Sequence, residues 1–533
     1  MPAARSDASA GTWPLTLLFW SLALALSWLG AFPMDDDWAY GEPVRRWLAG
    51  EGLRLSDWGS PTLLAHLAWG ALFCLPRGHS PGALRLSTLA LSWLAVLAFH
   101  QLLLRLGASR RAALAGALAL LFNPLYFLLS FSFMTDVPAL SWMLLASLGF
   151  LRGWQERRPG LVWAASAAAA VAYLVRQTGL CVPAAVCLWQ AARGERSWRA
   201  YVRVAALPAA ALALHALWAM GEPAAPEASL RAGVLAHLSQ PGIASITLGR
   251  AAGAVLFVAA FVSPLAPCAL AGVRDALKRG WGLAAAFAAA AAWVLSLGRL
   301  PVEPSIVGTT GLGVCSLAAC HLKAAGPFAS PWLWALFAAL AGLSLLAVAP
   351  RLAERRWREP AAVLAGGGFA LAFLVSLAHW VFYDRYLLVL LPPAIAVAAL
   401  AAPVTWPRAA PGLALAACIS VLGTWDYLAW TAAKWEAGRR FLSQGLEPEE
   451  IYAGLEWSGV HGFSKRAVEA WPRSERLRAY VSFAPAVSSG RLARVGEVPY
   501  FSPLTARRER VYLWRDPAPS KGSQEYRPKD LVD

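Results

Sequence analysis

Apolar runs of about twenty residues recur along most of the chain, and short polar stretches separate them. About twenty residues of α-helix are needed to cross the hydrocarbon core of a bilayer, so each run predicts a membrane-spanning helix. We predict about thirteen spans, over residues 12–32, 83–105, 111–132, 138–151, 160–175, 179–192, 202–220, 252–272, 281–298, 331–349, 361–382, 386–401 and 410–430. The apolar segment 60–73 is too short to span, and we expect it to lie at the interface or to re-enter.

The pattern changes after Trp430. Charges of both signs mix there, and three stretches, 449–457, 477–485 and 508–515, alternate between apolar and polar residues as short strands do. Residues 426–445 precede them with a helical pattern. The predicted fold class is therefore an all-α polytopic membrane protein, residues 1–430, with a small C-terminal α/β soluble domain, residues 431–533.

Composition supports the membrane assignment, because 58% of the residues are hydrophobic and 15% are charged, where soluble domains carry about 25% charged residues. The net charge of +16 is concentrated in alternate loops. By the positive-inside rule these loops are cytoplasmic. They contain Arg105, Arg110 and Arg111; Arg152, Arg157 and Arg158; Arg193, Arg196, Arg199 and Arg203; Arg274, Lys278 and Arg279; and Arg351, Arg355, Arg356 and Arg358.

This charge pattern places the N-terminus in the cytoplasm and the C-terminal domain outside, with outward loops at 33–60, 133–137, 221–250 and 299–330. The first run lacks a small-x-small cleavage site, which favours a retained span over a signal peptide. The basic loops also suit contact with anionic membrane lipids. We expect no nucleic acid partner, because no basic domain with interleaved aromatic residues occurs.

Cysteine and histidine patterns predict no structural metal. The seven cysteines include no CxxC pair, and the eight histidines lie apart from one another. We interpret the cysteines as small buried apolar residues. The alternative applies to Cys315 and Cys320, the pair that lies in a predicted outer loop and could form a disulfide there.

Three consecutive aspartates, Asp35 to Asp37, follow the first predicted span. One interpretation is a solvated acidic flank of the helix. The other is a functional site, because Asp136 lies in a second outward turn between two apolar spans, where an ionisable group is costly. Arg176 and Arg385 lie at comparable depth at the same membrane face.

Carboxylates and guanidinium groups together suit chemistry on a lipid-linked phosphate. Arginine can hold a phosphate bidentately at headgroup depth, while a carboxylate accepts a proton from an incoming hydroxyl or amine. The lipid tail would then lie between spans.

Three short motifs resemble those of the GT-C superfamily of membrane glycosyltransferases, in the branch of protein O-mannosyltransferases and lipid A aminoarabinose transferases. They are an outward DDxxY formed by Asp36, Asp37 and Tyr40, a short second loop TDVP around Asp136, and a late DRYLLVLLPP around Arg385. The resemblance covers roughly residues 11–393 in layout. It implies a GT-C-like fold and a polyprenyl-phosphate-linked sugar as donor.

The resemblance also implies roles. Asp36 corresponds to the proposed catalytic base, which contacts the acceptor or a metal, and Asp37 to a neighbour that orders the site. Tyr40 and Asp136 would position acceptor or donor, and Arg385 and Tyr386 would lie near the donor phosphate. We add Arg176 to the phosphate-binding residues from its topology alone. No cofactor is certain from these residues, and a divalent cation stays open.

A later segment, PEEIYAGLEWSG, resembles a GFEWNG-type segment that follows the last span in many bacterial members of this superfamily. Ser458 stands where those members often carry Asn, so we assign it no role. The bacterial resemblance and the spans together imply a multi-pass protein of the bacterial cytoplasmic membrane.

We predict an inverting glycosyltransferase that moves a sugar from a polyprenyl-phosphate carrier to a lipid, glycan or protein acceptor at the outer face. The sequence names neither the sugar nor the acceptor. The alternatives are a transporter or flippase for a lipid-linked sugar, and a non-catalytic sugar-lipid binding protein. Transporters typically have related halves and charges near mid-span. Here the charges lie at helix ends.

Overall fold

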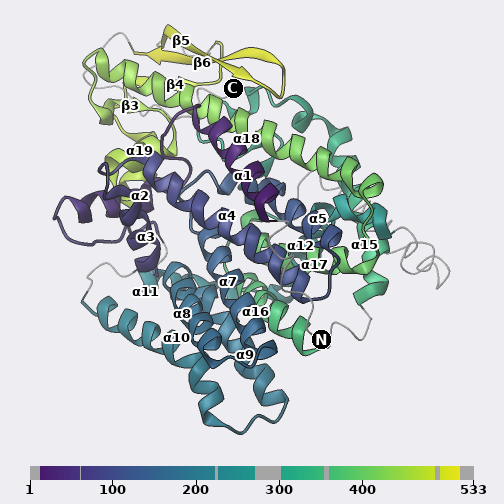
Figure 1. Ribbon diagram of the computed structural model, residues 1–533. Helices are drawn as coiled ribbons and strands as arrows, with labels where there is room; N and C mark the ends of the chain where they lie inside the picture. Colours follow the sequence, from purple (N-terminus) through teal and green to yellow (C-terminus); the bar gives the residue numbers. More distant parts are fainter. Residues whose placement is uncertain are drawn as a thin grey trace.

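The computed structural model describes residues 12–59, 62–221, 226–269, 302–352, 359–486 and 492–516. Helices dominate these residues, and a small sheet lies at one end of the helical body (Figure 1). The helices of the first half are α1 (Thr12–Ser27), α2 (Asp37–Leu48), α3 (Leu64–Cys74), α4 (Pro81–Arg105), α5 (Arg110–Leu121), α6 (Pro124–Leu129), α7 (Asp136–Gln155), α8 (Pro159–Val175), α9 (Cys181–Ala192), α10 (Trp198–Ala219), α11 (Pro226–Leu238) and α12 (Ile243–Phe261). Those of the second half are α15 (Pro331–Leu352), α16 (Pro360–Leu377), the 3-10 helix η6 (Asp384–Leu390), α17 (Leu391–Ala401), α18 (Trp406–Ser443), α19 (Leu455–Gly462) and α20 (Lys465–Ala470).

In the described part of the chain, seven helical segments are long and apolar enough to cross a bilayer. They are α4, α10, α12, residues 331–348 of α15, α16, η6 together with α17, and α18. Three shorter apolar helices, α1, α3 and α8, accompany them. The prediction of a mostly helical membrane protein with a small C-terminal sheet is confirmed. The count of about thirteen spans stays a prediction, and the predicted span 281–298 lies outside the described residues.

The predicted span 111–132 is divided into α5 and α6. Asn123 caps the second helix, because its side-chain oxygen accepts hydrogen bonds from the backbone N–H groups of Leu125 and Tyr126. Pro124 occupies the first position of that helix, where its missing N–H costs nothing. The Asn-Pro pair thus interrupts an apolar run that hydropathy alone joins into one span.

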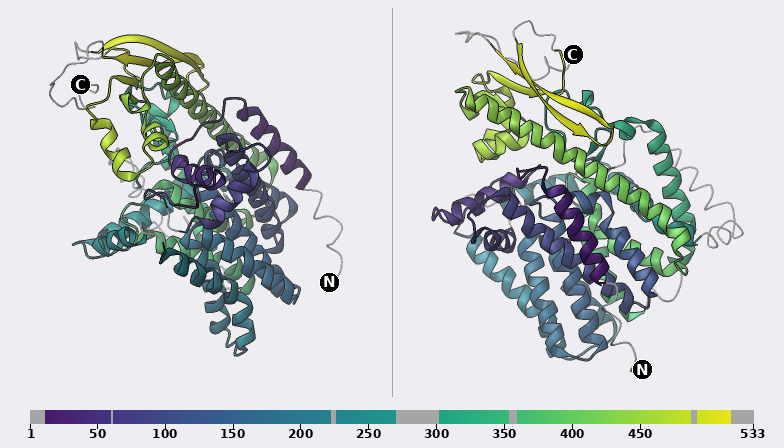
Figure 2. Two further views of the ribbon diagram at one scale, coloured as in Figure 1. Left: turned by 90° about the vertical axis from the view of Figure 1, so that its left-hand side faces the viewer. Right: turned by 45° about the horizontal axis from the view of Figure 1, so that its top comes forward.

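Helix α18 is one continuous helix of 38 residues. It joins the predicted span 410–430 to the predicted helix 426–445, and at 1.5 Å per residue it is about 57 Å long. The C-terminal sheet lies along its outer half (Figure 2). A single rigid element therefore connects the membrane body to the C-terminal part.

The C-terminal sheet has four strands in the order β3 (Ile451–Tyr452), β4 (Ala479–Ser482), β6 (Arg507–Arg515) and β5 (Ala493–Ser502). β3 pairs with β4 in parallel, and the other pairs are antiparallel. Strands were predicted near β3, β4 and β6, while β5 was missed. The predicted strand 449–457 is wrong beyond Tyr452, because Gly454 takes a φ of +93° and α19 begins at the next residue.

The loop of residues 302–330, which precedes α15, is folded against these elements. It contains a two-stranded hairpin of β1 (Val307–Gly308) and β2 (Gly311–Leu312). The buried carboxylate of Asp384 accepts hydrogen bonds from the backbone N–H groups of Ser305, Ile306 and Val307. One side chain at the start of η6 therefore fixes the start of this outer loop.

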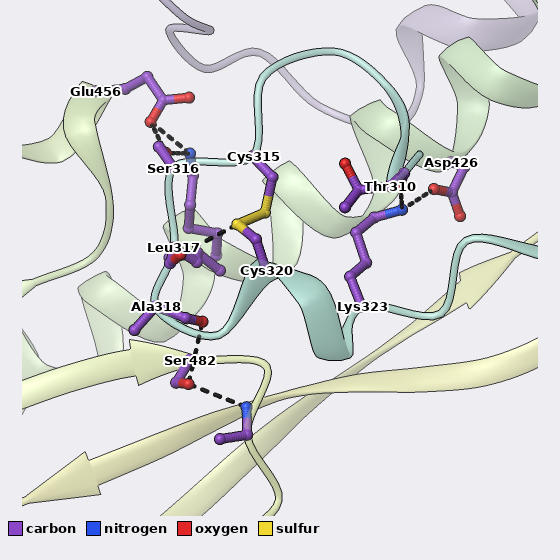
Figure 3. Close-up of a disulfide and its surroundings, with 12 residues drawn as sticks. Thr310, Cys315, Ser316, Leu317, Ala318, Cys320, Lys323, Asp426, Glu456 and Ser482 are labelled. Atoms are coloured by element: carbon purple, nitrogen blue, oxygen red, sulfur yellow. Dashed lines mark hydrogen bonds and ion pairs between the residues drawn. A yellow bond between two sulfur atoms is a disulfide. The ribbon is translucent and has the colours of Figure 1, made fainter. Parts of the chain in front are cut away.

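Cys315 and Cys320 form a disulfide in the same loop (Figure 3). The interpretation of all seven cysteines as unpaired apolar residues is therefore wrong for this pair, and the alternative holds. The two cysteines are five positions apart in the sequence, so the bond closes a tight turn. The other five are free, and of these Cys418 is exposed.

Candidate active site

The acid run lies where the loop after α1 enters α2, and all three residues are buried, with exposed fractions of 8% to 9%. Asp35 has a φ of +48°, in the left-handed region that aspartate tolerates better than most residues. Asp36 precedes the first residue of α2, which is Asp37. Asp35 and Asp36 face the same arginine, Arg385, whereas Asp37 faces the backbone of Phe133. The acids are therefore not a solvated flank of the helix.

Asp36 is held from two sides. Its Oδ1 accepts a hydrogen bond from the indole N–H of Trp58 at 2.7 Å, and its Oδ2 lies 3.3 Å from Nη2 of Arg385. Asp35 pairs with the same guanidinium, since its Oδ2 lies 3.2 Å from Nη1. One arginine from the start of η6 therefore binds two carboxylates that precede it by about 350 residues.

Asp37 points elsewhere. Its Oδ1 accepts from the backbone N–H of Phe133 at 2.7 Å, and its Oδ2 from that of Met34 at 3.2 Å. Burial raises the pKa of Asp37 to about 8, and these two hydrogen bonds oppose the shift only in part. Asp37 thus joins the loop after α1 to the loop before α7.

Asp136 and Arg176 form an ion pair at the ends of neighbouring helices. Asp136 is the first residue of α7, where the helix dipole favours a negative charge. Arg176 follows α8 directly, and its guanidinium lies 5.1 Å from the centre of the Tyr386 ring. The aromatic face and the carboxylate together fix the direction of this cation.

Arg385 does not pair with its neighbour Asp384, whose carboxylate is taken up by the backbone of the outer loop. Its guanidinium instead faces Asp35 and Asp36, and it lies 4.9 Å from the centre of the Tyr383 ring. Its Nε atom is buried and has no hydrogen-bond partner within the described residues. An unpaired buried donor is costly, so Arg385 retains a position for one more acceptor.

These groups line one cavity of about 700 Å³. Of the residues predicted from the sequence, Asp36, Tyr40, Asp136, Arg176, Arg385 and Tyr386 border it, and Asp37 does not. Tyr40 is buried with its ring edge toward His66, and burial raises the pKa of its hydroxyl. The fold therefore gathers six of the seven predicted residues around a common space.

The cavity also has walls that the sequence did not indicate. Asp35, Trp58 and His379 border it from the membrane body, and Leu455, Lys465 and Glu469 from α19 and α20 of the C-terminal part. Asp35 belongs to the acid run, but the DDxxY pattern directs attention to its two successors. Trp58 and the C-terminal residues have no local signal, since their role comes from contacts far along the chain.

The apolar wall is formed by residues of α16 and η6, which include Val375, Leu388 and Val389. The charged groups and this wall occupy the same cavity, so it can take a ligand with one anionic and one hydrocarbon part.

A divalent cation in this cavity would need several carboxylate, imidazole or thiolate ligands close together. Among the described residues, no group of three or more His, Cys, Asp or Glu side chains is arranged to hold a metal ion. The two adjacent carboxylates, Asp35 and Asp36, already share the guanidinium of Arg385. Both acids therefore already have a cationic partner, and a divalent cation stays a prediction from the sequence.

Residues 61–220 match the family model described as dolichyl-phosphate-mannose-protein mannosyltransferase. The resemblance to GT-C glycosyltransferases is confirmed. The description of this family model supports the glycosyltransferase activity that we propose for the chain. The matched segment contains Asp136 and Arg176, whereas Asp36 lies before it and Arg385 after it. The positions of the last two come from the geometry of the cavity.

Solved structures of this type resemble the chain at low identity. ArnT from Cupriavidus metallidurans, bound to undecaprenyl phosphate, is 15% identical with a TM-score of 0.44, over 98% of this chain and 100% of that one. The apo state of the same protein is 15% identical to this chain, with a TM-score of 0.42, over 97% of this chain and 100% of that one. The S. cerevisiae Pmt1-Pmt2 complex bound to the sugar donor is 16% identical to this chain, with a TM-score of 0.34, over 41% of this chain. The chain spans 33% of that yeast chain. No curated protein matches the chain.

The raised pKa of Asp37 predicts a pH-dependent stability. The folded state binds this proton more tightly than the unfolded chain, whose aspartate pKa is near 3.8. The stabilisation from Asp37 is therefore complete below that value and is lost as pH rises through about 8. Asp37→Asn is neutral at every pH, so its melting temperature should gain on the wild type as pH rises from about 5 to about 8. A constant difference between the two proteins would contradict the prediction.

Proposed function

We propose that the chain is an inverting glycosyltransferase that takes a sugar from a polyprenyl-phosphate carrier and transfers it to an acceptor at the outer face of the membrane. The observation that carries the proposal is one cavity that combines the Asp36–Arg385 pair, the Asp136–Arg176 pair and an apolar wall. The family match supports the donor class, because dolichyl phosphate is a polyprenyl phosphate.

The donor would bind with its phosphate at the two arginines. Arg385 offers an unpartnered Nε donor, and Arg176 lies beside Tyr386 on the same cavity. Guanidinium groups hold a phosphate through parallel N–H bonds and neutralise its charge. The hydrocarbon tail would lie along the wall formed by α16 and η6.

Asp36 would act as the general base. A carboxylate within reach of the acceptor removes the proton from its hydroxyl or amine as the acceptor atom attacks the anomeric carbon. The bond between that carbon and the phosphate oxygen breaks, and its electron pair stays on the phosphate. Polyprenyl phosphate leaves with the added charge facing the arginines. A single displacement of this kind inverts the anomeric configuration.

Trp58 and Arg385 hold the two oxygens of Asp36 in fixed directions before substrate binds. A phosphate bound to Arg385 would compete with Asp36 for the guanidinium. One carboxylate oxygen of Asp36 would then be free to accept the proton of the acceptor. The proposed reaction uses no divalent cation.

The orientation that we propose places the N-terminus in the cytoplasm and the cavity and C-terminal sheet outside, in the cytoplasmic membrane of a bacterium. Two observations support it. Basic residues cluster in the alternate loops. The Cys315–Cys320 disulfide lies in a loop beside the C-terminal sheet, and disulfides persist mainly in oxidising compartments.

Replacing Asp36 with Asn tests the base. The amide keeps the size and the contact with Trp58 but cannot accept the proton, so turnover should fall by roughly a hundredfold or more. The assay uses purified protein, a radiolabelled polyprenyl-phosphate mannose and membrane extract as the source of acceptor, and it scores release of free polyprenyl phosphate. Glu42→Gln is the matched control, since Glu42 is an α2 carboxylate that pairs with Arg45 away from the cavity.

Near-normal turnover of Asp36→Asn would remove Asp36 from the mechanism. The same assay separates the rival class of function. A transporter or flippase moves the intact lipid and releases no free polyprenyl phosphate.

Replacing Arg385 with Lys tests phosphate binding. Lysine keeps the charge but lacks the planar fork, so it should lose about 1 to 3 kcal/mol of charge-assisted hydrogen bonding to the donor. We expect the apparent KM for the lipid donor to rise several-fold or more, with a smaller effect on acceptor dependence. An unchanged KM for the donor in a well-folded variant would leave Arg176 as the main phosphate ligand.

Cysteine labelling tests the orientation. In a background that lacks the five free cysteines, Glu51→Cys should react with an impermeant thiol reagent added outside intact cells, and Arg158→Cys should not. Both positions are exposed, so solvent access is matched. Labelling of Arg158→Cys with protection of Glu51→Cys would invert the orientation.

A further inference from the structure

The segment Gly454 to Gly459, GLEWSG, begins α19 and packs against the loop that carries the acid run. The sequence resemblance gave it no role. Its Leu455 borders the cavity, and the glutamate that follows, Glu456, is fully buried. A carboxylate with no exposed surface is retained only where its contacts are specific.

Glu456 uses both of its carboxylate oxygens. Oε2 lies 2.7 Å from the ammonium of Lys434 on α18, and both side chains are fully buried. The same oxygen accepts a hydrogen bond from the hydroxyl of Ser316, next to the disulfide (Figure 3). Oε1 accepts from the backbone N–H of Asp35 at 3.3 Å. Glu456 thus joins α18, the disulfide loop and the acid run.

The contact with Asp35 falls at the strained point of the acid loop. Asp35 is the residue with the positive φ, and its side chain pairs with Arg385. A strained backbone persists only where its surroundings hold it in place. Because Lys434 balances the charge of Glu456, this carboxylate can hold the Asp35 N–H without adding an uncompensated negative charge beside the acids.

Two further contacts hold the same loop from the C-terminal side. The indole N–H of Trp435 on α18 donates to the carbonyl of Pro33 at 3.1 Å. Gly459 packs directly on the Trp38 ring, and a Cβ at that position would lie 2.2 Å from it. Trp38 in turn contacts Trp58, the donor to Asp36. The acid run is therefore held on both sides by residues of the C-terminal part.

A second buried ion pair provides a comparison. Lys323 and Asp426 also link the disulfide-bearing loop to α18, at 2.7 Å and with 1% exposure each, and Asp426 also accepts from a serine, Ser502. That unit has the same three chemical groups, but none of its described hydrogen bonds reaches the acid run. Attachment of the loop alone would therefore not require the Glu456 contact with Asp35.

We propose that Glu456 is a positioning residue for the transfer reaction: its Oε1 fixes Asp35, and through the shared Arg385 it sets the geometry of Asp36. The proposal rests on the proposed function of this cavity. It predicts that loss of the Asp35 contact lowers kcat more than it raises the KM for the lipid donor, since Arg176 still binds the phosphate while the catalytic base is displaced.

Two double variants isolate that contact. Lys434→Met with Glu456→Gln removes the ion pair but keeps an oxygen that can accept the Asp35 N–H. Lys434→Met with Glu456→Met removes the ion pair and the acceptor, with a side chain of similar length. Neither leaves an unpaired buried charge. We expect kcat of the Met variant to be roughly tenfold or more below that of the Gln variant, because small misplacements of a catalytic group are costly. The KM values for the polyprenyl-phosphate mannose should differ less than the kcat values.

Equal kcat values for the two double variants would overturn the proposal, since a purely structural ion pair predicts no difference between them. Asp36→Asn is assayed in parallel. If it loses turnover while the double variants are equal, only the role of Glu456 fails. If Asp36→Asn keeps turnover, the proposed function itself fails.

A glycine pair gives an independent test should a double variant not fold. Gly454 and Gly445 both have positive φ, +93° and +84°, so alanine strains the backbone at both. At Gly454 the added Cβ would lie 2.5 Å from the Ser316 hydroxyl, while at Gly445 nothing lies within 4 Å. Gly454→Ala should lower kcat roughly tenfold, and Gly445→Ala should stay within about threefold of the wild type. Equal effects would overturn the proposal.

Discussion

The site depends on one arginine that two aspartates share. Arg385 is the second residue of η6, and it faces Asp35 and Asp36 of the loop after α1. The beginning and the later part of the chain therefore meet in a single charge cluster. Two carboxylates in a largely buried place repel each other strongly unless a cation lies between them. The guanidinium allows both acids to stay close to the cavity, and the acids keep the guanidinium at a depth where an aromatic ring and an apolar wall surround it. Removing Arg385 would leave the two carboxylates without a cation between them.

Much of this arrangement follows from the sequence. Apolar length predicts the membrane helices, and the cost of an ionisable group at a helix end marks Asp136, Arg176 and Arg385 as residues that need partners. Six of the predicted residues border the cavity. The sequence does not tell which of three successive aspartates faces which way, because that depends on the left-handed turn at Asp35. Similarly, Asp384 and Arg385 are adjacent opposite charges, yet they serve two different neighbours, the outer loop and the acid run.

The missed features have a common cause. Trp58, Glu456 and the residues of α20 act through partners far along the chain, and a single sequence carries no signal for such pairs. The break between α5 and α6 is different, since Asn-Pro is a local signal for the end of one helix and the start of another. Averaged hydropathy hides it. Disulfide formation between Cys315 and Cys320 was open for the opposite reason, because spacing permits it and only the folded turn brings the sulfurs together.

The continuity of α18 bears on how related enzymes can be recombined. A boundary at residue 430, where composition changes, falls inside this helix, five positions before Trp435, which holds the acid run. A chimaera joined there would combine part of this helix from each parent. The directions in which Lys434 and Trp435 point from the helix would then no longer be matched to their partners. Gly445 lies just beyond the helix end in a turn, and no atom lies within 4 Å of a Cβ built there. A junction at this position would therefore cause no steric clash at the glycine. A junction at that glycine would keep Lys434 and Trp435 with the membrane body but separate them from Glu456, so the catalytic loop and the C-terminal part must be inherited together.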